Sequence, residues 1–129
     1  MPDSSDSRQI RSGTVAGMHE SMKKTVTEMM VLFLLRQRQM YVYEMSQEIS
    51  RLTDGVFAFN TLYLAIYRLQ ERGHIREAGK READNRVRVY FRITRSGQSY
   101  LHDLVTEYHR MTDAVEHMLA MDGKLTDPE

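Results

Sequence analysis

The side chains best suited to chemistry in this sequence are arginines and lysines gathered in one segment. Residues 58–95 carry nine basic and four acidic side chains, whereas residues 96–129 carry two basic and seven acidic ones. The chain as a whole is neutral, with 18 basic and 18 acidic residues, so the contrast comes from segregation of charge. A basic segment of this kind favours an anionic partner such as the phosphates of nucleic acid, with the acidic end turned away.

Catalytic and metal chemistry find little support. The chain has no cysteine, which excludes disulfides, thiol nucleophiles and thiolate metal sites. Its five histidines include no pair four residues apart, and His102 and His109 lie two helical turns apart, too far to share one ion. There is no glycine-rich phosphate loop and no nucleophile elbow. We therefore expect no enzymatic activity, no metal site and no cofactor.

Polar residues suited to reading DNA bases follow a helical pattern that we expect to begin at Asn60, as its cap, and to end at Gly73. The predicted core stripe of this helix is Leu62, Ala65, Ile66 and Leu69. The outward positions include Leu64 and five candidate DNA-binding residues: Asn60, Thr61, Tyr63, Tyr67 and Arg68. In a helix-turn-helix, residues at this end of the third helix meet base edges in the major groove. An ordinary solvated helix face is the simpler interpretation of the polar residues, but it does not explain two tyrosines and a leucine.

A β-hairpin is predicted after this helix, because the period of the pattern changes to two. In residues 86–93, apolar side chains share one face of a strand, and Arg86, Arg88, Tyr90 and Arg92 share the other. We expect residues 74–78 to pair with this strand across a turn at residues 79–85. The candidate phosphate ligands at or near the tip are Lys80, Arg81, Arg86 and Arg88. Glu82 and Asp84 dilute the local potential and also suit a hairpin that is merely solvated.

The other elements complete a recognisable order. Apolar spacing predicts a helix from His19 to about Arg38, a second helix from Val42 that ends at residues 53–55, and a long final helix from Thr94 to about Met121. The fold class is mainly α with a small β-hairpin (α+β): a winged helix-turn-helix followed by a long C-terminal dimerisation helix. We expect a disordered tail over residues 1–18, a DNA-binding domain over 19–94, the dimerisation helix over 95–121 and a flexible tail over 122–129.

The final helix carries the most regular apolar pattern. Its seam residues are spaced three and four apart: Leu101, Leu104, Tyr108, Met111, Val115 and Met118. A helix of about 25 residues would be about 38 Å long, too long for so small a domain to cover. Packing wholly on the chain's own first helix is the alternative, but a homodimer interface accounts better for the whole seam.

Three segments resemble the PadR family of winged-helix transcriptional regulators. Residues 60–75, with Thr61-Leu62-Tyr63 leading to Arg68-Leu69 and Gly73, are similar to the recognition-helix signature of the family. Residues 90–94 followed by Gly97 resemble its second wing strand and the start of its final helix, and residues 41–43 resemble the turn into its second helix. The similarity spans about residues 26–120, and the single final helix resembles the smaller branch of the family.

The resemblance implies a repressor that dimerises through its final helix and releases DNA in response to a signal. Some short members bind flat aromatic molecules between the two final helices on a tryptophan, and the matching position here is Tyr108, which makes a small aromatic effector a further expectation. The chain departs from the family pattern at Leu64, where proline is usual, at Val42, and in the acidic residues Glu82 and Asp84. These departures concern the DNA sequence that is read more than the fold.

Two hypotheses follow from these observations. The first is a homodimeric, sequence-specific DNA-binding regulator acting on a palindromic operator. The alternative is a winged-helix module that binds a protein partner and no DNA, favoured by Tyr63, Leu64 and Tyr67 together with Glu82 and Asp84. No apolar run approaches the roughly 20 residues needed to span a bilayer, and we expect a cytoplasmic protein.

Overall fold

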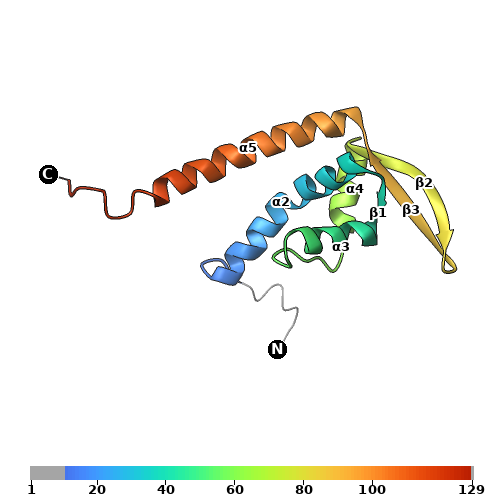
Figure 1. The fold of residues 1–129 in the computed structure, drawn as a ribbon, viewed down its shortest axis with the longest axis horizontal. Coiled ribbons are helices and arrows are strands. Elements are labelled where there is room, and N and C mark those ends of the chain that lie inside the picture. The colour runs from blue at the N-terminus through green and yellow to red at the C-terminus, as the bar shows by residue number, and fades with distance from the viewer. Residues whose placement is uncertain (1–10, 129) are drawn as a thin grey trace.

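The computed structural model describes residues 11–128, which form four helices and a three-stranded antiparallel sheet. The helices are α2 (Val15–Gln37), α3 (Val42–Leu52), α4 (Tyr63–Glu71) and α5 (Arg95–Leu119). The strands are β1 (Met40–Tyr41), β2 (Ile75–Ala83) and β3 (Arg86–Ile93), and β3 lies between the other two. This order confirms the predicted winged helix-turn-helix fold with a long final helix (Figure 1).

Helix α2 begins earlier than expected. The hydroxyl of Thr14 accepts a hydrogen bond from the backbone N–H of Gly17 at 2.9 Å and caps a helix that starts at Val15. The prediction of a disordered tail as far as residue 18 is therefore wrong for residues 15–18, because the capping signal of Thr14 lies outside the apolar pattern. The part of that prediction that concerns residues 1–10 lies outside the described residues.

Helix α2 is also the centre of the domain, since it packs against α3, α4, α5 and β3. Val31, Leu32 and Leu35 are almost completely buried. The apolar spacing in the sequence predicts a single buried face that omits them: Met22, Val26, Met29, Met30, Phe33 and Leu34. Phe33, which does belong to the predicted face, is 42% exposed. A helix surrounded on several sides must be apolar around much of its circumference, so a one-face pattern underestimates its buried surface.

Strand β1 is a short element that the sequence pattern did not predict. Met40 pairs with Phe91 and Tyr41 pairs with Tyr90, so two residues of the link between α2 and α3 extend the sheet. Met40 is buried on the core side of the sheet. Helix α3 follows at once and ends near Gly55, whose φ of +78° confirms the predicted stop.

The start of α5 is fixed against the junction between α4 and β2. Thr94 caps the helix as predicted, accepting a hydrogen bond from the N–H of Gly97 at 3.1 Å, and its hydroxyl also donates to the carbonyl of Gly73 at 2.6 Å. Gly97 must lack a side chain, because a Cβ there would lie 2.0 Å from the carbonyl oxygen of His74. The first turn of α5 thus holds the end of α4 and the root of the hairpin.

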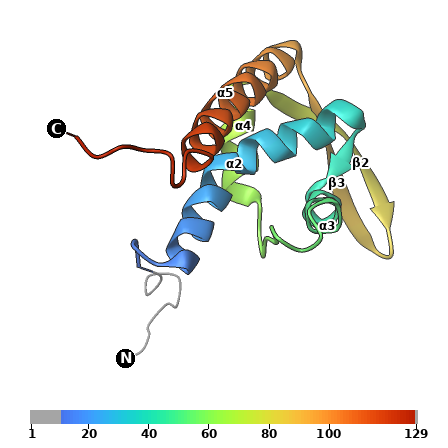
Figure 2. The same cartoon turned by 60° about the vertical axis from the view of Figure 1, so that its left-hand side comes forward.

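The elements place α5 and the hairpin tip on different sides of the domain. Helix α5 runs along one side, whereas the loop between α3 and α4 and the hairpin tip lie on the opposite side, as the two views agree (Figures 1 and 2). None of the helices formed by residues 11–128 combines the length and apolar character required to cross a membrane.

Candidate nucleic-acid interface

Helix α4 presents a fixed outer face at the surface. Leu62, Ala65, Ile66 and Leu69 are buried, as predicted. With this stripe in the core, the outer face carries large side chains that are more than half exposed: Tyr63 (68%), Leu64 (63%) and Tyr67 (61%). Arg68 is exposed on the same helix. The recognition-helix residues predicted from Tyr63 onward therefore lie at the surface.

The start of α4 differs from the prediction. The helix begins at Tyr63, its N-cap position is Leu62, and no side chain caps it. The hydroxyl of Thr61 accepts a weak hydrogen bond from the N–H of Tyr63 at 3.3 Å, so Asn60 is exposed in the loop and is not the cap. Burying Leu62 at 1% exposure fixes the chain just before the helix, which outweighs the capping preference of an asparagine two residues earlier.

The loop before α4 is held by contacts with α2. His19 Nε2 lies 2.7 Å from the carbonyl oxygen of Val56, and the ring of His19 stacks on Phe57 with centroids 5.4 Å apart. The ammonium of Lys23 lies 4.9 Å from the centroid of the Phe59 ring. These contacts orient α4 from its N-terminal end.

A Schellman motif orients α4 from its other end. The N–H of Gly73 donates to the carbonyl of Gln70 at 3.0 Å, and that of His74 donates to the carbonyl of Leu69 at 2.9 Å. Gly73 has a φ of +80°, which a residue with a side chain rarely adopts. Ile75 then enters the core at 1% exposure, so the direction of the hairpin relative to α4 is set by buried contacts.

The hairpin is longer and its turn tighter than predicted. Residues 84 and 85 alone form the turn, with φ values of +54° and +62°, and Ala83 pairs with Arg86. The expected turn over residues 79–85 is wrong, because Lys80, Arg81 and Glu82 are paired in β2. Lys80 and Arg81 therefore lie along the two-stranded ribbon formed by β2 and β3. Of the predicted phosphate ligands, only Arg86 lies next to its tip.

The register separates the basic residues between the two faces of the ribbon. Lys80 pairs with Val89, so it shares the face that continues the core, and Arg81 pairs with Arg88 on the outer face. The Arg81 guanidinium lies 4.5 Å from the ring centroid of Tyr90, and that of Arg88 lies 4.6 Å from the ring centroid of Tyr41. These cation–π contacts hold both guanidinium groups against the sheet.

A groove joins the recognition helix to the wing. It encloses about 430 Å³ between the start of α3, the start of α4 and the side of the ribbon. Tyr43 and Tyr63 line it from the helices, and Arg86, Val87 and Arg88 line it from β3. The structure thus brings a predicted recognition-helix residue and two predicted wing arginines to one concave surface. Tyr43, which sequence reasoning did not select, was visible only as part of the family-like turn at residues 41–43.

The acidic residues of the wing neutralise little of this charge. Asp84 lies 3.6 Å from the guanidinium of Arg88 and is 88% exposed, which makes it a weak surface pair. Glu82 pairs across the ribbon with Val87, on the face that carries Lys80. Among residues 11–128, no carboxylate lies within 4.0 Å of Lys80, Arg81 or Arg86.

The predicted seam of α5 divides into a covered part and an uncovered part. Leu101, the first predicted seam residue, is 1% exposed and packs in the chain's own core, so within this chain its side chain lies below the surface. Leu104 and Tyr108 are half-buried where α5 packs on α2. Met111, Val115 and Met118 are 47%, 56% and 75% exposed, and α5 extends past the rest of the domain there (Figure 1).

A polar contact fastens the covered half of α5 to α2. The hydroxyl of Tyr100 donates to Glu28 Oε1 at 2.9 Å, and the Tyr100 ring stacks on His74 with centroids 4.5 Å apart. Burial, followed by the hydrogen bond to Glu28, raises the pKa of Tyr100 above its ordinary value. The imidazole of His74 also lies 2.8 Å from the hydroxyl of Ser96, which links the same junction to the first turn of α5.

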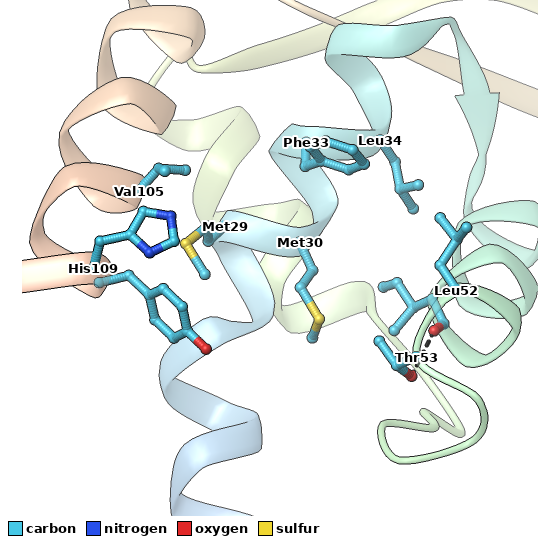
Figure 3. A pocket seen from close by; sticks show the side chains of 10 residues that line it. Met29, Met30, Phe33, Leu34, Leu52, Thr53, Val105 and His109 are labelled. Carbon is cyan, nitrogen blue, oxygen red and sulfur yellow. Dashed lines mark hydrogen bonds between the residues drawn. The ribbon is translucent and has the colours of Figure 1, made fainter. Parts of the chain in front are cut away.

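An apolar cavity of about 290 Å³ lies between α2, α3 and α5 (Figure 3). Met29, Met30 and Phe33 line it from α2, and Val105 and His109 line it from α5. Tyr108, the predicted aromatic-ligand residue, also lines this cavity.

In the part of the chain that the structure describes, no cluster of three or more histidine, aspartate or glutamate side chains could hold a metal ion.

Comparisons with known proteins agree with this geometry. The chain is 34% identical over 116 residues to an uncharacterised protein of Lysinibacillus sphaericus, covering 88% of this chain and 97% of that protein. It resembles the structure of a transcriptional regulator from Clostridium thermocellum, with 27% identity, a TM-score of 0.69, and coverage of 75% of this chain and 96% of that one. It also resembles a PadR family transcriptional regulator from Eggerthella lenta, with 26% identity, a TM-score of 0.68, and coverage of 81% and 91%.

The family profile described as the transcriptional regulator PadR-like family matches residues 31–103, more than half of the chain. The matched region runs from the C-terminal third of α2 to the first turns of α5 and so includes the recognition helix and the wing. Members of this family are transcriptional regulators and not enzymes, in agreement with the absence of catalytic motifs from the sequence. This chain belongs to the PadR-like family of transcriptional regulators.

Proposed function

We propose that the chain is a homodimeric, sequence-specific DNA-binding repressor that acts on a palindromic operator. The observation that carries the proposal is the shared concave surface formed by the start of α4 and the ribbon. Tyr63 and Tyr67 are exposed where a helix-turn-helix protein meets base edges, and Tyr63 lines one groove together with Arg86 and Arg88. In a dimer, two such surfaces would enter major grooves about 34 Å apart.

The base-contacting residues in this proposal are Asn60, Thr61, Tyr63, Tyr67 and Arg68. The phosphate-contacting residues are Lys80, Arg81, Arg86 and Arg88. Arginine suits phosphate because its planar guanidinium donates two parallel hydrogen bonds.

The first experiment is a gel shift on the promoter region of the gene that encodes this chain, with competitor DNA and at two salt concentrations. We expect a specific complex that survives the competitor and weakens as salt rises. Arg86→Ala and Arg88→Ala should each weaken binding to all sequences and lower the steepness of the salt dependence by about one. Arg110→Ala is the matched control, because Arg110 lies on α5 and pairs with Glu107. An unchanged salt dependence in both wing variants would contradict their assignment.

Homodimerisation is supported by the exposed apolar surface of α5. Met111, Val115, Met118 and Leu119 are between 47% and 75% exposed, which is unusual for large apolar side chains gathered on one helix end. We expect Val115→Glu to convert a dimer into a monomer in sedimentation experiments at micromolar concentration. Thr106→Glu adds the same charge at an exposed polar position of α5 and should leave the dimer intact. A wild-type monomer at this concentration would refute the dimer.

Release by a ligand is the finer part of the proposal. The cavity beside Tyr108 has a nearly apolar wall and a volume suited to a small flat molecule. Quenching of tyrosine fluorescence by a planar cationic dye should be reduced in Tyr108→Ala. Unchanged quenching in that variant would remove Tyr108 from any ligand site.

A protein-binding module is the second candidate function. It is favoured by the outer face of α4, where Tyr63, Leu64 and Tyr67 are all more than 60% exposed. The same gel shift separates the two functions, since a module of this kind would form no specific complex with DNA at either salt concentration.

A further inference from the structure

The outer face of the ribbon carries five arginines, which we call the arginine face: Arg76, Arg81, Arg86, Arg88 and Arg92. Pairing of Arg76 with Arg92, Arg81 with Arg88 and Ala83 with Arg86 places all five on the side of the sheet that faces away from the core. The acidic residues of the two strands, Glu77 and Glu82, pair with Phe91 and Val87 on the opposite side. The strands thus separate their charges by face.

A bulge in β2 creates this arrangement. The register shifts between Glu77 and Gly79, so one residue of β2 has no partner in β3. In a regular strand Arg76 and Arg81, five residues apart, would point to opposite sides. The bulge moves the alternation by one residue and brings both to the outer face.

The arginine face works against the stability of the isolated hairpin. Arg76 lies directly opposite Arg92, and Arg81 lies directly opposite Arg88, and like charges facing each other across a sheet are destabilising. Of the five arginines of this face, only Arg88 has a carboxylate within 4.0 Å among the residues that the structure describes. The stacking of Arg81 on Tyr90 and of Arg88 on Tyr41 offsets the repulsion within the Arg81–Arg88 pair. The pair formed by Arg76 and Arg92 has no such contact among the described residues. A polyanion bound to this face would remove the repulsion at both.

The position of the face identifies which part of a duplex it meets. The groove runs along the open edge of β3 beside the start of α4, where Val87 of the core face and Arg86 and Arg88 of the outer face line it, so DNA seated there meets the ribbon at this edge and at its tip, away from the root. The ribbon stands at one end of the domain and the C-terminal end of α5 at the other (Figure 1). If two copies pair through α5, the arginine face points outward along the duplex. From Arg86 to Arg92 it is about 20 Å long, at about 3.3 Å per residue.

We propose that the arginine face binds backbone phosphates of the DNA that flanks the operator, and that this DNA bends toward the ribbon root. Arg76 and Arg92, at the root, are the residues that only flanking DNA would reach. The inference rests on the proposed function, because it requires a dimer already seated on an operator. It extends the interface beyond the bases and phosphates assigned to α4 and the hairpin tip.

The test compares two lengths of the same duplex. The probes are the shortest duplex that the wild-type protein selects from a random library, and that duplex lengthened at each end by about 12 base pairs, roughly one helical turn. We expect the wild-type protein to bind the longer duplex more tightly and with a steeper salt dependence, by about two to four in the slope of log affinity against log salt. The Arg92→Gln variant should bind the short duplex as the wild type does. On the long duplex, its slope of log affinity against log salt should be smaller than that of the wild type by about two. Lys80→Gln, on the other face of the ribbon, is the matched control and should weaken binding to both lengths equally.

Each result has one meaning. Equal wild-type affinity for the two lengths would overturn the inference while leaving the proposed function intact, whereas selection of no duplex at all would refute the proposed function. An equal loss of affinity by Arg92→Gln on both lengths, or no loss on either, would also overturn the inference.

Thermal unfolding without DNA gives an independent readout: Arg92→Gln should raise Tm by about 1–4 °C at low salt, because it removes a like-charge pair. An unchanged or lower Tm would contradict the repulsion on which the argument depends.

Discussion

The two faces of the small sheet differ in composition and in role, although they are formed by the same strands. On the core face, Met40, Ile75, Phe91 and Ile93 are at most 9% exposed and join the sheet to the helices. On the outer face, arginines and tyrosines are exposed or half-buried, and the arginines include two pairs of like charges. Because strand residues alternate between faces, a single strand such as β3 can specify the fold with every second residue and an interface with the others.

This difference predicts that truncating neighbouring residues of β3 changes the free energy of unfolding by very different amounts. We expect Phe91→Ala to lower the free energy of unfolding by about 3–5 kcal/mol, since it removes a buried aromatic side chain. Arg92→Ala, one residue away, should change the same quantity by no more than about 0.5 kcal/mol at physiological salt. Urea unfolding followed by circular dichroism measures both, and similar losses in the two variants would end the distinction between the faces.

The tight turn keeps each residue on its face, because a slip of one position would exchange them. Asn85 has a φ of +62°, which a β-branched residue adopts at a cost of about 1–2 kcal/mol. Asn85→Val should therefore lower stability by about that amount and weaken DNA binding. Asn85→Gly tolerates the same backbone and serves as the control in thermal unfolding and gel shifts. Equal behaviour of the two variants would show that the turn does not set the register.

The smallest expected effect concerns the tyrosines that position the outer arginines. Tyr90→Leu removes the ring beneath Arg81 and should weaken DNA binding by about 0.5–1 kcal/mol, a factor of about two to five. Tyr90→Phe keeps the ring and should bind as wild type does. Fluorescence anisotropy with a labelled duplex is sensitive enough for this comparison. Equal losses in the two variants would assign the role to the Tyr90 hydroxyl instead of the cation–π contact.

Periodicity in the sequence was sufficient to predict the separation of faces in β3 and the order of the four helices and the hairpin, although not β1. It predicted the core stripe of α4 as well, since Leu62, Ala65 and Leu69 are spaced for one helix face. It failed where backbone geometry outweighs pattern. The charged residues 79–85 look like a loop, but a bulge and a two-residue turn with positive φ values fold most of them into β2.

The candidate site was predictable by segment but not by face. The basic character of the wing is plain in the sequence, whereas the grouping of Arg76 with Arg81 depends on the bulge in β2. The contact of Arg88 with Tyr41 depends on β1, which joins residues about 50 positions apart and has too short a pattern to detect. Similarly, the burial of Leu101 against the core depends on how α5 packs on α2, which the regular spacing of the seam does not reveal.

Hydrogen–deuterium exchange of the protein with and without its selected duplex tests the central claim most directly. The account predicts slower exchange in two regions when DNA is bound, residues 60–68 at the start of α4 and residues 76–92 of the ribbon. It also predicts no change in residues 108–119 of α5, because the dimer already covers them before DNA arrives. Protection confined to α5, or no protection of α4 and the ribbon, would contradict the proposal that this face of the molecule binds DNA.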